Sequence, residues 1–136
     1  MEKLYLEIIT PERVMIRQDV DTVEAPGTAG EFGVLPGHVA FLSTLGHGEI
    51  RFIADGGARF IATSGGFAEV LENRVTFLLD TAEFAEEVDV TRALRAKERA
   101  EGGLKGLSLE QEEYLRFQAA LMRSITRISV ASKTGG

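Results

Sequence analysis

The sequence predicts an α+β protein in which an N-terminal antiparallel β-sandwich is followed by a C-terminal two-helix antiparallel hairpin. As far as about Thr81, short β-prone segments are separated by glycine and proline. From Asp89 onward the apolar residues recur with a helical period, and no proline occurs after Pro36. We therefore expect a sandwich domain at residues 1–85 and a helical arm at residues 86–136.

The predicted strands are apolar and β-prone, and several alternate apolar with polar residues, as a strand with one buried face does. They cover residues 4–9, 13–17, 20–25, 49–53, 59–62, 67–71 and 75–79. Pro26 and Gly27 predict a turn. Residues 55–57 and 72–74 predict two hairpin connections.

The first predicted helix begins at Asp89, a residue type that caps helix N-termini, and is rich in helix-forming residues. Gly102, Gly103 and Gly106 are expected to break it, because each glycine disfavours a helix by about 1 kcal/mol. Ser108 with Gln111 three residues later resembles a capping box, which predicts a second helix over about 109–129. Its apolar stripe would comprise Tyr114, Phe117, Leu121, Ile125 and Ile128. A hairpin of this kind buries little surface and should detach readily from an acidic platform.

Composition excludes several classes of function. Among 136 residues, 44% are hydrophobic, 26% are charged and none is cysteine, so disulfides and thiolate chemistry are excluded. With only His38 and His47, we expect no metal site. The net charge is -6 and the acidic excess lies in the first part, so no nucleic-acid partner is expected. The sequence shows no signal-peptide leader and no apolar run long enough to span a membrane. It contains no phosphate-binding loop, dinucleotide-binding motif or nucleophile motif, so we expect no catalytic residues.

Several arginines of the second part share helix faces. Arg116, Arg123 and Arg127 lie on one face of the second predicted helix, and Arg92 and Arg99 on one face of the first. If the hairpin brings these faces together, the guanidinium groups can bind a polyphosphate through bidentate hydrogen bonds. The alternative is a solvated cationic face with intrahelical ion pairs. Its acidic partners would be Glu98, Glu101, Glu112 and Glu113.

The whole chain resembles the epsilon subunit of the F-type (proton-translocating) ATP synthase, and four segments carry the resemblance. They read LEIITPERVMI, GEFGVLPGHVAFLSTLGHGEIRF, SGGFAEVLENRVTFLLDTAE and VDVTRALRAKERAE. Their order and spacing agree with the family. One departure is Ala40, where the family often has proline, and it affects only the local turn.

The resemblance implies a non-catalytic subunit of the central stalk, bound to the gamma subunit and seated on the ring of c subunits. Membrane association would be indirect, on the cytoplasmic face of the bacterial plasma membrane. The arm would either fold on the sandwich or extend toward the catalytic alpha and beta subunits and suppress hydrolysis. Within GEFGVLPGHVAFL, glycines and Pro36 would turn the chain between strands. Glu31 would face the ring from a loop, and His38 would lie near gamma.

In some bacterial members the folded hairpin binds ATP through a motif that begins [Ile/Leu]-Asp-x-x-Arg-Ala. Here the matching residues are Val88, Asp89, Arg92 and Ala93. The resemblance adds Glu83, Arg99, Arg123 and Arg127 to this predicted ATP site. No cofactor would be required, and ATP would act as a regulatory ligand. The alternative function is a free-standing module that binds a nucleotide or peptide and has no rotary partner.

Overall fold

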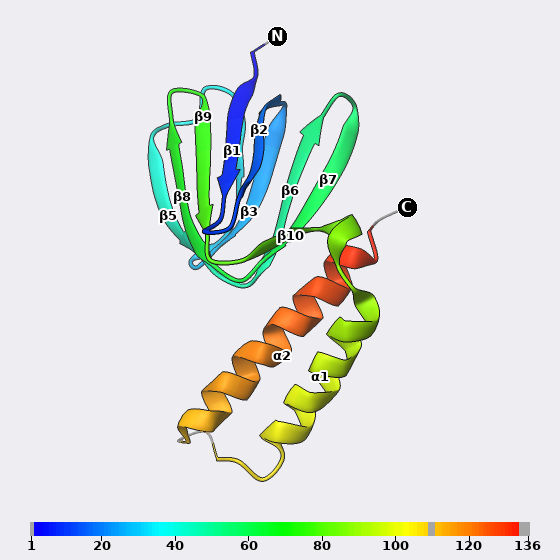
Figure 1. Ribbon diagram of the computed structural model, residues 1–136. Coiled ribbons are helices and arrows are strands. Elements are labelled where there is room, and N and C mark those ends of the chain that lie inside the picture. Colours follow the sequence, from blue (N-terminus) through cyan, green and yellow to red (C-terminus); the bar gives the residue numbers. More distant parts are fainter. Residues whose placement is uncertain (1, 109–110, 134–136) are drawn as a thin grey trace.

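The chain folds into strands followed by helices, as predicted from the change of period (Figure 1). A computed structural model describes residues 2–108 and 111–133. Its strands are β1 (Leu4–Ile9), β2 (Val14–Val20), β3 (Thr22–Gly27), β4 (Gly30–Val34), β5 (Phe41–Leu45), β6 (Gly48–Ala54), β7 (Gly57–Thr63), β8 (Gly66–Leu71), β9 (Arg74–Leu79) and β10 (Ala82–Phe84). Its helices are a short 3-10 helix η1 (Ala85–Glu87), α1 (Val90–Leu104) and α2 (Glu112–Ala131).

The strands form one hydrogen-bonded sheet that curls over itself into two layers. Their order is β10-β7-β6-β3-β5-β8-β9-β1-β2, with β4 paired to the side of β3. Pairing is antiparallel except between β1 and β9, which run parallel. Strand β2 also lies against β6, which closes the fold around a single core. The predicted β-sandwich is therefore confirmed.

The core follows from the period of two in each strand. In β1, Leu4, Leu6 and Ile8 are fully buried, while the residues between them are partly exposed. Phe52 from β6 and Phe77 from β9 are the largest fully buried side chains. Each such side chain contributes roughly 1.5–3 kcal/mol by leaving water.

Two hairpin turns lie where the sequence predicts them. Asp55 and Gly56 connect β6 to β7 with φ angles of 53° and 77°. Glu72 and Asn73 connect β8 to β9 with φ angles of 49° and 61°. Positive φ at both central residues matches the twist of the flanking strands, which explains the choice of aspartate, glycine and asparagine.

The segment between residues 26 and 45 differs from its prediction. Pro26 and Gly27 do not form a turn but end β3, and Pro26 lies opposite Glu31 of β4. Proline suits an extended backbone where no ladder hydrogen bond is needed from its nitrogen. Strands β4, β5 and β10 are additional to the predicted set. The segment turns at two places: Thr28 and Ala29 connect β3 to β4, and Pro36 and Gly37 form a second turn, in which Gly37 has a φ of 88°.

Asp89 caps α1 as predicted, since its carboxylate accepts a hydrogen bond of 3.0 Å from the backbone nitrogen of Arg92. The predicted break is wrong at Gly102 and Gly103, because α1 continues to Leu104, but it is right at Gly106, which lies just beyond the helix with a φ of 80°. Packing of α1 against α2 outweighs the weak helix propensity of glycine.

The second helix begins at Glu112, later than predicted; Leu109 and Glu110 lie outside the described residues. Half of the predicted capping box forms, because the Gln111 side chain accepts a 2.8 Å hydrogen bond from the backbone nitrogen of Ser108. The apolar stripe is partly wrong: Ile125 is 44% exposed, whereas Ser124 is buried. No helix among the described residues has the length and hydropathy needed to cross a bilayer.

The hairpin docks on the sandwich through the C-terminal end of α2. Figure 1 shows it projecting from the end of the sandwich opposite the start of β1, with the C-terminal end of α1 and the N-terminal end of α2 pointing away from the strands. A small apolar cluster joins Val130 of α2 to Ala62 of β7 and Ala85 of η1. Because this cluster is so small, polar contacts carry much of the attachment.

Candidate functional site

A pocket of about 560 Å³ lies where the helical hairpin meets the sandwich. The helices contribute Ala96, Arg99, Ala100, Phe117, Ala120, Arg123, Ser124, Thr126 and Arg127. The sandwich contributes Glu12, Ala62, Thr63, Ser64, Thr81, Ala82 and Glu83. The volume falls within the roughly 300–1,000 Å³ range of small-molecule sites, so a ligand here would contact both parts of the chain.

Three arginines line this pocket from two helices. Arg99 comes from α1, whereas Arg123 and Arg127 come from successive turns of one face of α2. Arg99 and Arg123 form no ion pair with any residue in the described ranges. Each guanidinium therefore keeps its donors, in the fork geometry that matches phosphate or carboxylate oxygens.

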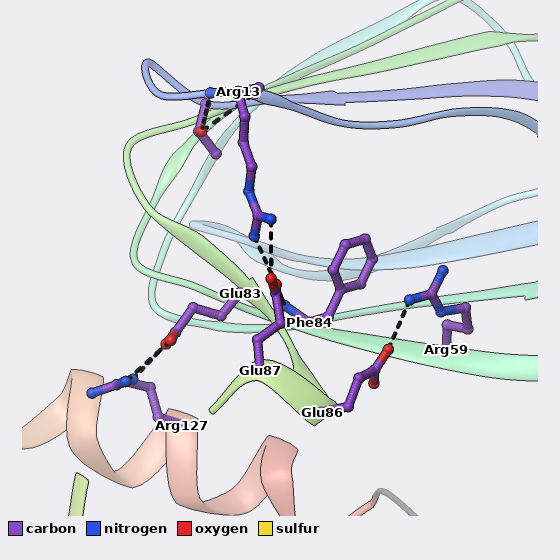
Figure 2. A network of polar contacts seen from close by, with 8 residues as sticks. Arg13, Arg59, Glu83, Phe84, Glu86, Glu87 and Arg127 are labelled. Atoms are coloured by element: carbon purple, nitrogen blue, oxygen red, sulfur yellow. Dashed lines mark hydrogen bonds and ion pairs between the residues drawn. The ribbon is translucent and has the colours of Figure 1, made fainter. Parts of the chain in front are cut away.

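Arg127 is bound to Glu83 of β10. Its Nε lies 2.5 Å from Glu83 Oε1 and its Nη2 lies 3.1 Å from Oε2, a bidentate pair between arm and sandwich (Figure 2). The two side chains are 25% and 33% exposed. This pair both fixes the arm and orients Arg127 at the edge of the pocket.

Four of the predicted ATP-site residues do not line the pocket. Val88 and Asp89 lie between η1 and α1, and Asp89 is engaged in capping α1. The side chain of Arg92 points to solvent, since the residue is exposed, and Ala93 is buried against the rest of the hairpin. The structure thus gathers Glu83, Arg99, Arg123 and Arg127 at one place and leaves the motif at the start of α1.

The arginine faces predicted from spacing are only partly realised. Arg116 lines a second, smaller hollow beside Phe117 instead of the main pocket. The alternative of intrahelical pairs is not realised either. Over residues 2–108 and 111–133, no ion pair involves Glu98, Glu101, Glu112 or Glu113.

The segment that leads into the arm is held to the sandwich by charged side chains (Figure 2). Arg13 donates to both carboxylate oxygens of Glu87, at 3.0 and 2.7 Å. Arg59 donates to Glu86 at 2.7 Å and lies over the Phe84 ring, 4.2 Å from its centroid. The hydrogen bond from Arg59 lowers the pKa of Glu86, and that from Arg13 lowers the pKa of Glu87.

A further contact ties down the end of the arm. Lys133, just after α2, lies 2.6 and 2.8 Å from the two carboxylate oxygens of Glu49 in β6. Its ammonium also lies 5.3 Å from the centre of the Phe60 ring. Besides the pair between Arg127 and Glu83, ion pairs thus hold the arm to the sandwich at two places, just before the beginning of α1 and just after the end of α2.

Two residues of the sandwich near the pocket, Thr63 and His47, were not predicted as part of the site from the sequence. Thr63 is buried and donates a 3.0 Å hydrogen bond to the backbone oxygen of Thr81, which shapes the pocket wall. His47 has a buried Nδ1 without a partner among the described residues. Burial, and then the nearby charge of Arg123, lower the pKa of His47. Their positions depend on contacts between distant segments, so no local pattern marks them.

The two predicted docking residues lie at opposite ends of the sandwich. Glu31 is exposed and lies in strand β4, not in a loop, near the end of the sandwich that carries the arm. His38 is half-buried in the turn beside Asn73, at the other end. Its Nδ1 lies 2.7 Å from the backbone oxygen of Val39, and its ring lies edge-on to Phe41 with 5.8 Å between centroids.

An apolar face on the outside of β5, β8 and β9 is open to solvent. Leu42 is 71% exposed, and Phe67 and Leu78, which lie directly opposite each other, are 56% and 52% exposed. Leu71 at the end of β8 extends this face. Clustered exposed apolar side chains of this kind are typical of a protein–protein contact.

Two family models together match almost the whole chain. The ATP synthase, Delta/Epsilon chain, beta-sandwich domain matches residues 3–85. The ATP synthase, Delta/Epsilon chain, long alpha-helix domain matches residues 86–132. The division between them falls at η1, where the strands end.

Whole-chain similarity agrees with the family models. The chain is 50% identical to an ATP synthase epsilon chain from Syntrophobacter fumaroxidans, over 98% of each sequence. It is 48% identical to one from Nitratidesulfovibrio vulgaris, over 96% of this chain and 97% of the relative.

Two solved structures share the fold. One belongs to the mitochondrial ATP synthase of Euglena gracilis, with a TM-score of 0.77, 23% identity and coverage of 96% of this chain and 81% of that one. The other belongs to the mitochondrial ATP synthase of Tetrahymena thermophila, with a TM-score of 0.63, 15% identity and coverage of 99% and 98%. By its family models and its close relatives, the chain belongs to the epsilon chains of ATP synthase.

Proposed function

We propose that this chain is a non-catalytic central-stalk subunit whose sandwich docks on the gamma subunit and the c ring, and whose arm regulates rotation. Family membership supports the stalk role, and the second solved relative is described as part of a central stalk and c ring. The apolar face of Leu42, Phe67, Leu71 and Leu78 is our candidate for the gamma contact, since burying it removes apolar surface from water. Membrane association would then be indirect, on the cytoplasmic face.

The observation that carries the regulatory part is the pocket shared by arm and sandwich. We assign its ligand as ATP, because Arg99, Arg123 and Arg127 line a cavity large enough for a nucleotide and can donate to phosphate oxygens. Arg127 would share its donors between Glu83 and the ligand. Asp89 and its neighbours would act indirectly, by starting α1 in the correct orientation.

A ligand bound between the two parts favours the docked arm over the released arm. The shift equals RT ln(1 + [L]/Kd), about 2.7 kcal/mol at a ligand concentration one hundred times Kd. When ATP falls, the docked state loses this contribution and the arm is released toward the alpha and beta subunits. There it would obstruct rotation and so suppress hydrolysis.

Calorimetric titration of the purified chain with ATP tests the ligand assignment. We expect Arg99→Ala to weaken binding and Arg95→Ala to leave it unchanged. Both residues are exposed on α1, but only Arg99 lines the pocket. Absence of heat at millimolar ATP in the parent chain would remove the nucleotide and leave the stalk role intact.

Removal of the arm tests its regulatory role separately. A chain that ends before Val88 keeps every strand and all of the core described above. In the assembled complex we expect it to copurify with gamma and to raise the rate of ATP hydrolysis. Failure to copurify would contradict the stalk role, whereas unchanged hydrolysis would contradict the inhibitory role of the arm.

A further inference from the structure

The side of α1 that faces α2 is built from small residues. Ala93, Ala96, Ala100 and Gly103 recur three or four positions apart, and Ala93 and Ala100 are buried. Residues at this spacing lie on one face of a helix. Small side chains on that face allow the two helices to approach closely, because the distance between helix axes depends on the side chains at the contact.

At Gly103 the approach leaves no room for a side chain. A Cβ atom there would lie well within 3.0 Å of three atoms of the Phe117 ring. At the neighbouring Gly102, a Cβ atom would meet nothing within 4 Å. Neither glycine has a left-handed φ, so backbone strain does not explain them. The need for space around the Phe117 ring explains the glycine at position 103 but not the glycine at position 102.

Phe117 has a special place in the hairpin. It lines the main pocket and also the second hollow of about 440 Å³, which Glu113, Arg116 and Ala120 complete. The ring is thus part of the wall between the two spaces. A methyl group at position 103 would have to displace this ring or push the helices apart.

We propose that the Phe117 ring packs into the space left by the absent side chain of Gly103, and that this contact determines how closely the two helices of the arm pack. Gly103 is a positioning residue: it acts through Phe117 and touches no ligand. Glycine is otherwise the residue least suited to a helix interior apart from proline. Glycine in the last turn of α1 lowers the helix propensity there, but it allows the two helices of the hairpin to pack closely. The proposal needs no nucleotide and stands independently of the proposed function.

The separation of the helices can be measured directly by spin-label distance measurements on the full chain. The protein has no cysteine, so Glu98→Cys and Gln118→Cys introduce the only two labelling sites, both exposed and outside the pocket. We expect Gly103→Ala to lower the ratio of closed to open hairpin by about fivefold or more, as overpacking of a contact does. The Gly102→Ala control should keep the parental distance and raise helix content.

A double substitution shows whether the ring is responsible. In a Phe117→Ala background, Gly103→Ala should no longer change the distance, because the methyl group then meets no ring. Circular dichroism of each variant separates opening of the hairpin from unfolding of its helices. The proposal is overturned if Gly103→Ala gives the same distances as Gly102→Ala, or if it opens the hairpin equally with and without Phe117.

Discussion

The bidentate pair between Arg127 and Glu83 makes a quantitative prediction about docking of the arm. Arg127→Ala removes hydrogen bonds of 2.5 and 3.1 Å that join α2 to β10. Fully exposed ion pairs contribute about 0.2–1 kcal/mol, whereas hydrogen bonds to charged groups contribute about 1.5–3 kcal/mol. The side chains of Arg127 and Glu83 are 25% and 33% exposed. We therefore expect the free-energy contribution of this pair to lie between those of an exposed ion pair and a buried charged hydrogen bond, at about 1–2 kcal/mol.

That free energy translates into a change in the population of released arm. A loss of about 1–2 kcal/mol raises the ratio of released to docked arm about 5–30-fold. Proteolysis reports this ratio when opening and closing are fast relative to cleavage. We therefore expect a protease that cuts at apolar residues to cleave residues 84–88 of Arg127→Ala about 5–30 times faster than those of the parent.

Arg116→Ala is the matched control, because Arg116 is an exposed arginine on the same helix and forms no ion pair among the described residues. Its cleavage rate should equal that of the parent. High salt should accelerate cleavage of the parent more than of Arg127→Ala, since screening weakens the pair. Equal cleavage rates for the two arginine variants would refute the assignment of docking energy to this pair.

Three further outcomes follow from the structure. Asp89→Ala should cost about 1 kcal/mol of stability by removing the cap of α1, measured by thermal melting, while Asp89→Asn should cost much less. The pKa of His47 is lowered from 6.5 in the folded chain. The stability linked to neutral His47 is therefore intact above pH 6.5 and is lost as pH falls through the lowered pKa. The melting temperature of His47→Gln should lack this part of the pH dependence. The pKa of Glu87 is lowered from 4.5, so the stability it provides is present above pH 4.5 and is lost as pH falls through the lowered pKa. The difference in melting temperature between the parent and Arg13→Ala should therefore shrink in acid, and a constant difference would contradict the pairing.

The elements that could be predicted are those whose cause is local. The alternation of Leu4, Leu6 and Ile8 is enough to identify a strand with one buried face. Asp55 with Gly56 specifies a tight hairpin through its own backbone preferences. Asp89 caps a helix through a hydrogen bond to a residue only three positions away.

The elements that were missed depend on partners distant in the chain. β5 exists because Phe41–Leu45 pairs with Gly66–Leu71 of β8, and the short apolar run shows no sign of that partner. β10 is only three residues long and is defined by its pairing with β7. Gly102 lies inside a helix because tertiary packing outweighs a local preference of about 1 kcal/mol.

The candidate site divides in the same way. Of the eight ATP-site residues that the family resemblance supplied, the fold brings four together at one pocket: Glu83, Arg99, Arg123 and Arg127. Arg92, which both spacing and resemblance placed with them, and Arg116, which spacing alone placed there, lie elsewhere. The direction in which a helical side chain faces depends on how the helix is rotated about its axis, and docking decides that rotation.

Local patterns of residues are enough to predict the sandwich and the helical arm, and the resemblance carried by four segments predicts the family. The way in which the arm attaches depends on contacts that exist only in the folded chain. Glu83 and Arg127 are 44 residues apart in the chain, and their contact requires β10 and α2 to be in place first. Periodicity and turn chemistry act over a few residues, whereas a pocket arises from surfaces that meet only after folding.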